Sequence, residues 1–202
     1  FEGVGVYYSA MPIEAQLCRG EEVAVVGGGN SAGQAAVFLA KTAKRVHVVV
    51  RATGLAETMS RYLIRRIETN PAIVLRPQTE IVALEGGNHL ERVRWRDTET
   101  GAVTTHDIRH VFSMTGAVPS TSWLDGCVAL DENGFIKTGP DLSKENLAAA
   151  HWPLARPPHL LETSLPGVFA VGDVRRGNVK RVASAVGEGS IAITFVHEAL
   201  QE

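Results

Sequence analysis

The sequence contains little cysteine, little net charge and no long apolar run, and each of these shortages excludes a class of protein. Only two of its 202 residues are cysteines, Cys18 and Cys127, and neither falls in a CxxC or metal-ligand spacing. No metal site is therefore predicted. Such sparse cysteine is typical of the reducing cytoplasm, where we expect this protein, with both thiols packed inside the fold.

The net charge and the hydropathy of the sequence exclude further classes of binding partner. A net charge of −2 argues against nucleic acid or an anionic membrane as the main partner. A transmembrane helix needs about twenty consecutive apolar residues, and no run in this sequence approaches that length, so no membrane span is expected. The length and the apolar content are instead sufficient for the core of one large domain or two small ones.

What the sequence does contain is a glycine-rich turn between a strand and a helix. Glu22–Val26 is a short valine-rich run, typical of a buried parallel strand. It breaks at Gly27–Gly29 and continues into the alanine-rich helical segment Asn30–Ala43. The spacing Gly27-x-Gly29-x-x-Ala32 is therefore a dinucleotide-binding fingerprint in its proper strand–turn–helix setting.

Each position of this fingerprint has a physical role in binding a pyrophosphate. Gly27 permits the tight turn, Gly29 lets the backbone approach the phosphates, and Ala32 lets the helix pack close to the strand. The unpaired N–H groups at the start of the helix then face the phosphates. The alternative is a merely structural turn, whose glycines serve packing alone.

A second strand-like run indicates which dinucleotide is bound. Arg45–Val50 ends about twenty residues after the glycines, where the adenosine ribose lies in such folds. NAD and FAD sites usually place Asp or Glu there, whereas this strand ends in Val50-Arg51. A cation suits a 2′-phosphate, so Arg51 favours NADPH over NADH, unless it is an ordinary surface arginine. His47, inside the same strand, is expected to be packed rather than to bind a ligand.

The order of elements up to Gly116 predicts an α/β domain with a β insertion. The first βαβ unit covers Glu22–Val50, and the insertion contains a hairpin that turns at Thr98–Gly101. Strands are expected at Val4–Tyr8, Ala72–Arg76, Thr79–Glu85, Leu90–Asp97, Ala102–Ile108 and Arg109–Thr115, and a short helix at Ile13–Leu17. A longer helix is expected at Leu55–Thr69, with an apolar face of Met59, Tyr62, Leu63 and Ile67.

After Gly116, prolines and glycines separate short segments. We expect a strand at Gly134–Lys137, an exposed loop at His151–His159 and a helix at Ala183–Leu200. The apolar run Thr163–Asp173 ends in Gly-Asp. A short strand there would bring Asp173 to the carboxyl edge of a sheet, where α/β folds bind their ligands.

With these motifs the chain resembles the C-terminal two-thirds of a thioredoxin-reductase-like flavoprotein of the pyridine-nucleotide-disulfide oxidoreductase superfamily. The resemblance covers essentially all of the sequence. The motifs that carry it are Gly27–Ala32, Val46–Val49, Thr115-Gly116-x-x-Pro119, Thr163–Asp173 and Val186–Gly189.

The resemblance implies a Rossmann-like NAD(P)-binding domain with a β insertion at residues 1–116, and the C-terminal half of an FAD-binding domain at residues 117–202. It implies NADPH as the dinucleotide, FAD in the full-length protein, and hydride transfer from nicotinamide to flavin, for which no side chain here needs to be catalytic. Asp173 would meet the ribityl–phosphate region of FAD. The implied cofactor-binding residues are Gly27, Gly28, Gly29, Asn30, Ser31, Ala32, Arg51, Gly116, Gly172 and Asp173, with Lys180, Arg181 and Val182 bordering the isoalloxazine.

The sequence departs from the family pattern at the redox cysteines. Thioredoxin reductases carry a CxxC pair just before the GGGN strand, but here Ser9-Ala10-Met11-Pro12 occupies that place. Serine cannot form the disulfide that passes electrons to thioredoxin, and proline has no side-chain nucleophile.

Two further departures concern the nucleotides. Of the family's basic cluster for the 2′-phosphate only Arg51 has a match, since Ala52 and Ala56 stand where the other arginines are expected, so NADH use stays open. The chain also has a single fingerprint, and Val50-Arg51 makes that one the wrong type for FAD. We therefore expect a fragment whose N-terminal FAD-binding half is missing and which is inactive alone, from a protein that is homodimeric at full length.

Three functions are compatible with this pattern. The first is an NADPH-dependent flavoprotein reductase of thioredoxin-reductase type whose electron acceptor is not a proximal dithiol. The second is an enzyme like ferredoxin- or flavodoxin-NADP reductase, because versions of these with the same fold lack CxxC. The third is a redox-silent NADP-binding regulatory module fused to a sensor domain.

Overall fold

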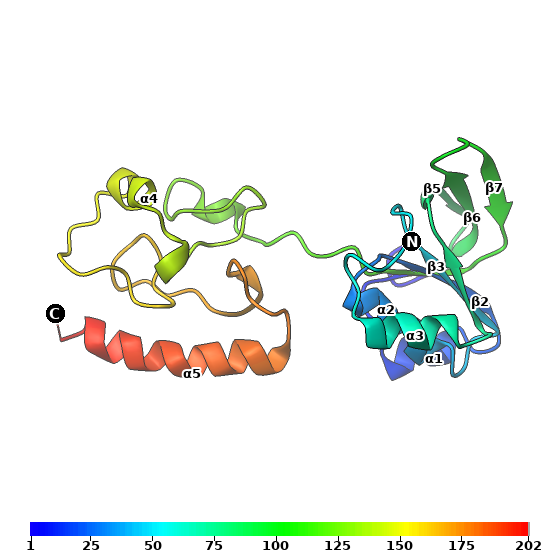
Figure 1. Cartoon of the computed structure of the whole chain (residues 1–202), viewed down its shortest axis with the longest axis horizontal. Coiled ribbons are helices and arrows are strands. Elements are labelled where there is room, and N and C mark those ends of the chain that lie inside the picture. The colour runs from blue at the N-terminus through cyan, green and yellow to red at the C-terminus, as the bar shows by residue number, and fades with distance from the viewer. Residues whose placement is uncertain (202) are drawn as a thin grey trace. The chain divides into compact units, whose positions relative to one another are not determined.

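The computed structural model describes residues 1–201 and divides the chain into two compact units, Phe1–Gly116 and a second that starts at Ala117 (Figure 1).

The first unit is built on a five-stranded parallel sheet with the order β1-β8-β2-β3-β4. Its strands are β1 (Val6–Tyr7), β2 (Glu22–Val26), β3 (Arg45–Val49), β4 (Ile73–Arg76) and β8 (His110–Ser113). Strand β2 is central, since it pairs with β3 on one side and β8 on the other. Its carboxyl end, where the glycine-rich turn begins, therefore lies in the middle of the sheet edge.

A three-stranded antiparallel sheet and three helices complete this unit. The sheet has the order β5-β6-β7, with β5 at Thr79–Gly86, β6 at Leu90–Asp97 and β7 at Val103–His106. The helices are α1 (Pro12–Leu17), α2 (Asn30–Leu39) and α3 (Arg61–Glu68). The predicted α/β domain with a β insertion is confirmed.

The side-chain alternation of the strands separates two cores. Val23 and Val25 of β2 are fully buried in a cluster with the apolar residues of the three helices. Ala24, between them, points to the other face and packs in a cluster with Leu90 and Trp95 of β6. The helices therefore cover one face of the parallel sheet and the antiparallel sheet covers the other, as Figure 1 shows.

The helix expected at Leu55–Thr69 begins later and buries less than predicted. It starts at Arg61, because Ser60 is extended with φ −63° and ψ 142°. The residues before it instead form a turn in which the Met59 amide donates to the Leu55 carbonyl over 3.0 Å. Tyr62, expected on the apolar face, is 66% exposed, and its hydroxyl accepts a hydrogen bond from Arg66.

The second unit contains two helices, α4 (Lys144–Ala149) and α5 (Val182–Ala199), and the short 3-10 turns η1 (Ser122–Leu124), η2 (Gly139–Asp141) and η3 (Gly172–Val174). The strand predicted at Gly134–Lys137 is wrong, and so is the strand predicted before Asp173. Ile136 makes only isolated bridges to Leu130 and Arg175, and Phe169 makes one to Glu162. A strand needs a ladder of several pairs, and the described residues supply only these bridges.

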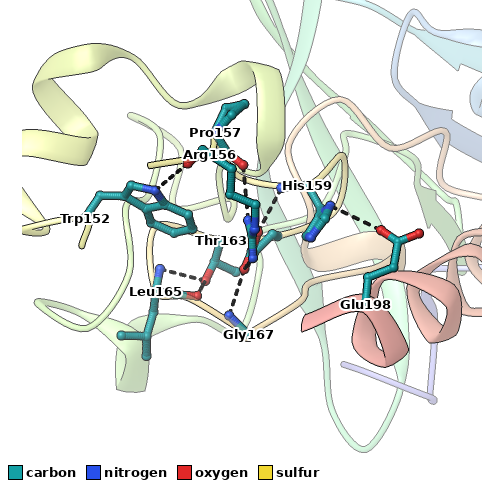
Figure 2. A network of polar contacts seen from close by, with 9 residues as sticks. Trp152, Arg156, Pro157, His159, Thr163, Leu165, Gly167 and Glu198 are labelled. Carbon is teal, nitrogen blue, oxygen red and sulfur yellow. Dashed lines mark hydrogen bonds and ion pairs between the residues drawn. The ribbon is translucent and has the colours of Figure 1, made fainter. Parts of the chain in front are cut away.

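The buried carboxylate of Glu162 holds the loops before η3 together, and Figure 2 labels its partners Arg156, His159 and Gly167. Glu162 is fully buried. It accepts hydrogen bonds from Arg156 at 2.7 and 3.2 Å and from the amides of His159 and Gly167, each at 2.8 Å. Burial raises the pKa of this carboxyl, but Arg156 and the two amides outweigh that and hold the pKa below its ordinary value. The loop containing Arg156 is thereby fastened to the run that leads to Gly172.

Candidate functional site

The turn after β2 is closed tightly by Gly27. This residue has φ 136°, which only glycine adopts without strain, and a methyl group on it would lie 2.6 Å from the Met114 carbonyl oxygen. The same methyl would lie 3.4 Å from the β-carbon of Ala32, which is fully buried. Gly27 and Ala32 therefore let the start of α2 approach the sheet edge closely.

Gly29, two residues on, faces open space. No heavy atom lies within 4 Å of the place where its β-carbon would be, and its φ of −89° is ordinary for any residue. Gly29 is the N-cap of α2, without a capping side chain, and the first intrahelical bond runs from the Gly33 amide to its carbonyl over 3.1 Å. The amides of Asn30, Ser31 and Ala32 thus point out of the helix end without an intrahelical acceptor, which is the arrangement that binds phosphates.

The loop between β3 and α3 forms a wall beside this helix end. Thr58 donates its hydroxyl to the Gly28 carbonyl at 2.8 Å, and the Ser60 amide donates to Oδ1 of Asn30 at 2.8 Å. Underneath, a methyl group at Gly33 would lie 2.7 Å from the sulfur of Met59, so the loop packs directly on α2. Sequence reasoning missed these contacts; the fourth glycine of the motif, Gly33, was the available signal for a close approach.

Arg51 stands at the carboxyl end of β3, where the sequence predicted a cation. The backbone on each side of it is fixed, since Thr79 and Gln78 donate their amides to the carbonyls of Val50 and Ala52 at 2.9 and 3.0 Å. Its side chain is exposed and makes no hydrogen bond, ion pair or ring contact with the described residues. Arg51 is therefore held at the sheet edge with an available guanidinium.

His47 is a packed residue, as predicted. It is 4% exposed, its Nε2 lies 3.0 Å from Glu22, and its ring meets Trp95 edge-on at 5.2 Å between centroids. Burial lowers the pKa of His47, against the opposing effect of Glu22.

In the second unit, the predicted Gly-Asp pair lies in η3. The Gly172 amide donates to Glu188 of α5 at 2.8 Å, and Glu188 also pairs with Arg175. Arg175, with the Gly172 amide, lowers the pKa of Glu188 to about 2. Glu188 thus fixes the turn that presents Asp173, whose side chain is exposed. Sequence reasoning included Glu188 in the motif Val186–Gly189 but gave it no role, because the sequence does not show that it will contact Gly172 and Arg175.

The residues predicted to border a flavin ring lie at the start of α5. Val182 opens the helix and is 83% exposed, and Arg181 is its N-cap. The Lys180 ammonium lies over the ring of Phe135, 4.1 Å from its centroid, so one face of this phenyl ring is already covered. Gly116 is the last residue of the first unit and has a φ of 103°.

The two cysteines differ in exposure, and the segment in place of CxxC lies at the start of α1. Ser9 is exposed, and Pro12 is the first residue of α1. Cys18 is fully buried, and its burial raises the pKa of its thiol. Cys127 is exposed, so the prediction that both thiols are packed is wrong for this residue. Cys127 comes shortly after the 3-10 turn η1, none of whose residues is buried. No apolar core therefore lies there to bury the thiol.

Neither metal-binding nor membrane-spanning features occur in the part of the chain that the structure describes. No three histidine, cysteine or acidic side chains of residues 1–201 gather closely enough to hold a metal ion. No helix of those residues has both the length and the apolar character for crossing a bilayer.

Known proteins are similar to this chain over nearly its whole length. The family model described as pyridine nucleotide-disulphide oxidoreductase matches residues 2–189. A thioredoxin reductase of Eremothecium gossypii is 32% identical over 187 residues, covering 92% of this chain and 52% of the relative. One of Chlamydia trachomatis is 33% identical over 176 residues, covering 87% and 50%. The chain thus spans about half the length of the curated relatives it matches.

Solved structures give the same result. The crystal structure of a thioredoxin reductase from T. acidophilum aligns with a TM-score of 0.78 at 27% identity, covering 100% of this chain and 59% of that one. The Lactococcus lactis thioredoxin reductase, in its FR conformation, aligns with a TM-score of 0.76 at 25% identity, covering 97% and 59%. The Rossmann-like α/β fold is therefore confirmed by both comparisons.

Proposed function

The chain belongs to the pyridine nucleotide-disulphide oxidoreductase family and is thioredoxin-reductase-like, as its motifs predicted, and on this premise we propose that its first unit binds NADP(H). The second unit is then the C-terminal part of an FAD-binding domain. The whole protein is an NAD(P)H-dependent flavoprotein oxidoreductase, in which the nicotinamide supplies hydride and the flavin accepts it.

The observation that carries this proposal is the contrast between Gly27 and Gly29. A turn whose glycines served packing alone would fill the space at both positions. Here only Gly27 is needed for packing, since a methyl at Gly29 would meet nothing within 4 Å. The open side lies at the uncapped start of α2, so the space and the amide donors fit a pyrophosphate. Gly28, Asn30, Ser31 and Ala32 complete that cradle in our proposal.

The second unit offers part of an FAD site. We assign the flavin contacts to Gly172 and Asp173 and to the start of α5, Lys180 to Val182. The exposed carboxylate of Asp173 on a turn anchored by Glu188 is suited to accept hydrogen bonds from the ribityl chain. These groups supply one side of a binding site only, which supports an assignment of FAD to the longer protein rather than to this chain.

The acceptor is proposed to be something other than a dithiol beside the flavin. Ser9 and Pro12 stand at the family's cysteine positions and cannot form a disulfide. The same substitution also suits a reductase of ferredoxin or flavodoxin, so the acceptor is proposed here by exclusion alone.

Isothermal titration of this chain with NADPH, NADH and FAD tests the proposal. We expect NADP(H) to bind and FAD not to bind, because only the former has a complete site. FAD binding as tight as that of NADPH would contradict this division. In the full-length protein, stopped-flow bleaching of the flavin by NADPH separates an enzyme from a redox-silent regulatory module, which would leave the flavin oxidised.

A further inference from the structure

The peptide that joins Gly28 to Gly29 is held by the side chain of Thr58. The Thr58 hydroxyl donates a hydrogen bond to the Gly28 carbonyl oxygen at 2.8 Å. A β-carbon on Gly28 would lie 3.3 Å from the same hydroxyl oxygen, so Thr58 lies directly against this glycine. The amide of the same peptide, that of Gly29, donates to no acceptor among residues 1–201. One end of the peptide is thus engaged and the other end is available.

The hydrogen bond to the carbonyl decides where the amide points. A trans peptide directs its carbonyl oxygen and its amide hydrogen in opposite directions within one plane, and every peptide of the described residues is trans. Because Thr58 holds the Gly28 carbonyl toward the loop between β3 and α3, the Gly29 amide points away from that loop. The Gly29 amide is therefore an available donor beside the uncapped start of α2.

The backbone by itself does not enforce this orientation. Glycine adopts positive and negative φ about equally readily, so a peptide between two glycines can rotate at little steric cost. A half-turn would place the Gly28 carbonyl oxygen where the Gly29 amide now stands and would present a partial negative charge to a phosphate. The bond from Thr58 opposes this rotation, because the rotation would break it.

The residues that follow Thr58 fix its own position. Met59 is 5% exposed and packs against α2. Ser60 donates its amide to the Asn30 side chain at 2.8 Å. The Thr58 hydroxyl therefore meets the glycine-rich turn at a defined place, although it lies 30 residues from Gly28 in the sequence.

Resting on the proposed function, we propose that Thr58 is a positioning residue of the nucleotide site, which directs the Gly29 amide to the pyrophosphate by holding the Gly28 carbonyl on the opposite side. Thr58 acts through this peptide and does not itself contact the nucleotide. Because NADPH and NADH have the same pyrophosphate, Thr58 supports the binding of both and sets no preference between them.

The first test compares the affinities of the 202-residue chain for NADPH and NADH by isothermal titration, in the parent sequence and in Thr58→Val, Thr58→Ser and Thr69→Val. Valine keeps the shape of threonine without the donor, and serine keeps the hydroxyl. Thr69 is a matched control, because its exposed hydroxyl also donates to a backbone carbonyl at 2.8 Å, that of Arg65 at the far end of α3. We expect Thr58→Val to weaken both nucleotides by a similar factor of about three to ten, and the other two variants to stay within about twofold of the parent.

A second measurement separates the orientation of the peptide from the stability of the fold. An amide proton that becomes hydrogen-bonded to a phosphate moves to higher frequency in amide proton–nitrogen correlation spectra. On addition of NADPH we expect the Gly29 signal to move in this way in the parent sequence and in Thr58→Ser, and to move much less in Thr58→Val. Because Thr58 is exposed, urea unfolding should show the valine variant to be folded.

Four results would overturn the proposal. Unchanged affinities in Thr58→Val, with a Gly29 signal that moves as in the parent, remove Thr58 from the site and leave the proposed function intact. A loss for NADPH alone assigns Thr58 to the 2′-phosphate. An equal loss in Thr58→Ser assigns the effect to the methyl group, and an equal loss in Thr69→Val makes it a general consequence of removing a surface hydroxyl. If the parent sequence binds neither nucleotide, the proposed function itself fails, which is distinct from these four results.

Discussion

Two variants, Gly29→Ala and Gly27→Ala, separate nucleotide binding from packing within one turn. Both changes add a single methyl group to a glycine of the fingerprint. At Gly27 the methyl would lie 2.6 Å from the Met114 carbonyl oxygen and the residue would keep a φ of 136°. At Gly29 it would lie in open space on ordinary backbone. We expect the first variant to lose stability and the second to lose nucleotide affinity.

The structure sets the size of each effect. A non-glycine residue in a strained backbone region costs about 1–3 kcal/mol. The Met114 carbonyl cannot retreat freely, because the amide of the same residue donates to Val26 at 2.8 Å. Gly27→Ala should therefore lower the free energy of unfolding by about 3 kcal/mol or more. Gly29→Ala loses about 1 kcal/mol as a poorer N-cap and regains about 0.4–1 kcal/mol by stiffening the unfolded chain.

Urea unfolding followed by circular dichroism measures the stabilities, and isothermal titration measures the affinities. For Gly29→Ala we expect a midpoint close to that of the parent sequence. We expect NADPH and NADH each to bind at least about tenfold more weakly, because both have the pyrophosphate that the methyl would displace. Unchanged NADPH affinity in a folded Gly29→Ala protein would refute the reasoning, and so would a Gly27→Ala protein as stable as its parent.

Three other predictions follow from the pKa values and the missing dithiol. Glu188 has a folded-state pKa of about 2 against an ordinary 4.5, so the stability that it contributes above pH 4.5 is lost as the pH falls toward 2. In Glu188→Gln the urea midpoint should therefore depend less on pH over that range than in the parent sequence. The same pH dependence in both proteins would show that Glu188 does not cause this loss of stability. Burial depresses the pKa of His47 below 6.5, so the unfolded chain binds more protons and stability drops as the pH falls below about 6.5. His47→Asn should reduce the fall of the melting temperature between about pH 7 and about pH 5. An unaltered fall would show that other titrating groups cause it. Full-length protein should pass electrons from NADPH to ferricyanide or quinone dyes but hardly to thioredoxin, and strong thioredoxin turnover that survives Cys18→Ser and Cys127→Ser would exclude this.

Much of the first unit could be predicted because its signals are local. The valine-rich strand, the glycine turn and the alanine-rich helix follow one another within Glu22–Leu39, and each depends on residues close in sequence. The hairpin of β6 and β7 has the same local character. The start of α3 could not be predicted in this way, because the helical pattern continues back to Leu55. Contacts with Gly28 and Asn30, distant in sequence, hold that segment in a turn instead.

In the second unit the strand predictions failed for a related reason. A short segment such as Gly134–Lys137, with two apolar residues between turn residues, is typical of a strand, but a strand also needs hydrogen-bonding partners along its length. Among the described residues Ile136 has single bridges to Leu130 and Arg175 and no ladder. The buried Glu162 was equally invisible, since a glutamate is expected at the surface until Arg156 and two backbone amides are seen to surround it.

The sequence by itself determined the class of this protein: the spacing Gly27-x-Gly29-x-x-Ala32 after a buried strand and the later Gly-Asp motif carry the family resemblance, and Ser9-Ala10-Met11-Pro12 shows that no CxxC pair precedes that strand. Only the tertiary structure decided which glycine packs and which faces open space, and which contacts hold the loop between β3 and α3 against the start of α2. The physical reason is that turns and short helices depend on neighbours in the chain. The space beside Gly27 depends instead on Met114, and the position of the loop before α3 depends on the contacts of Thr58 and Ser60 with the glycine-rich turn. Folding alone brings these three residues to the turn.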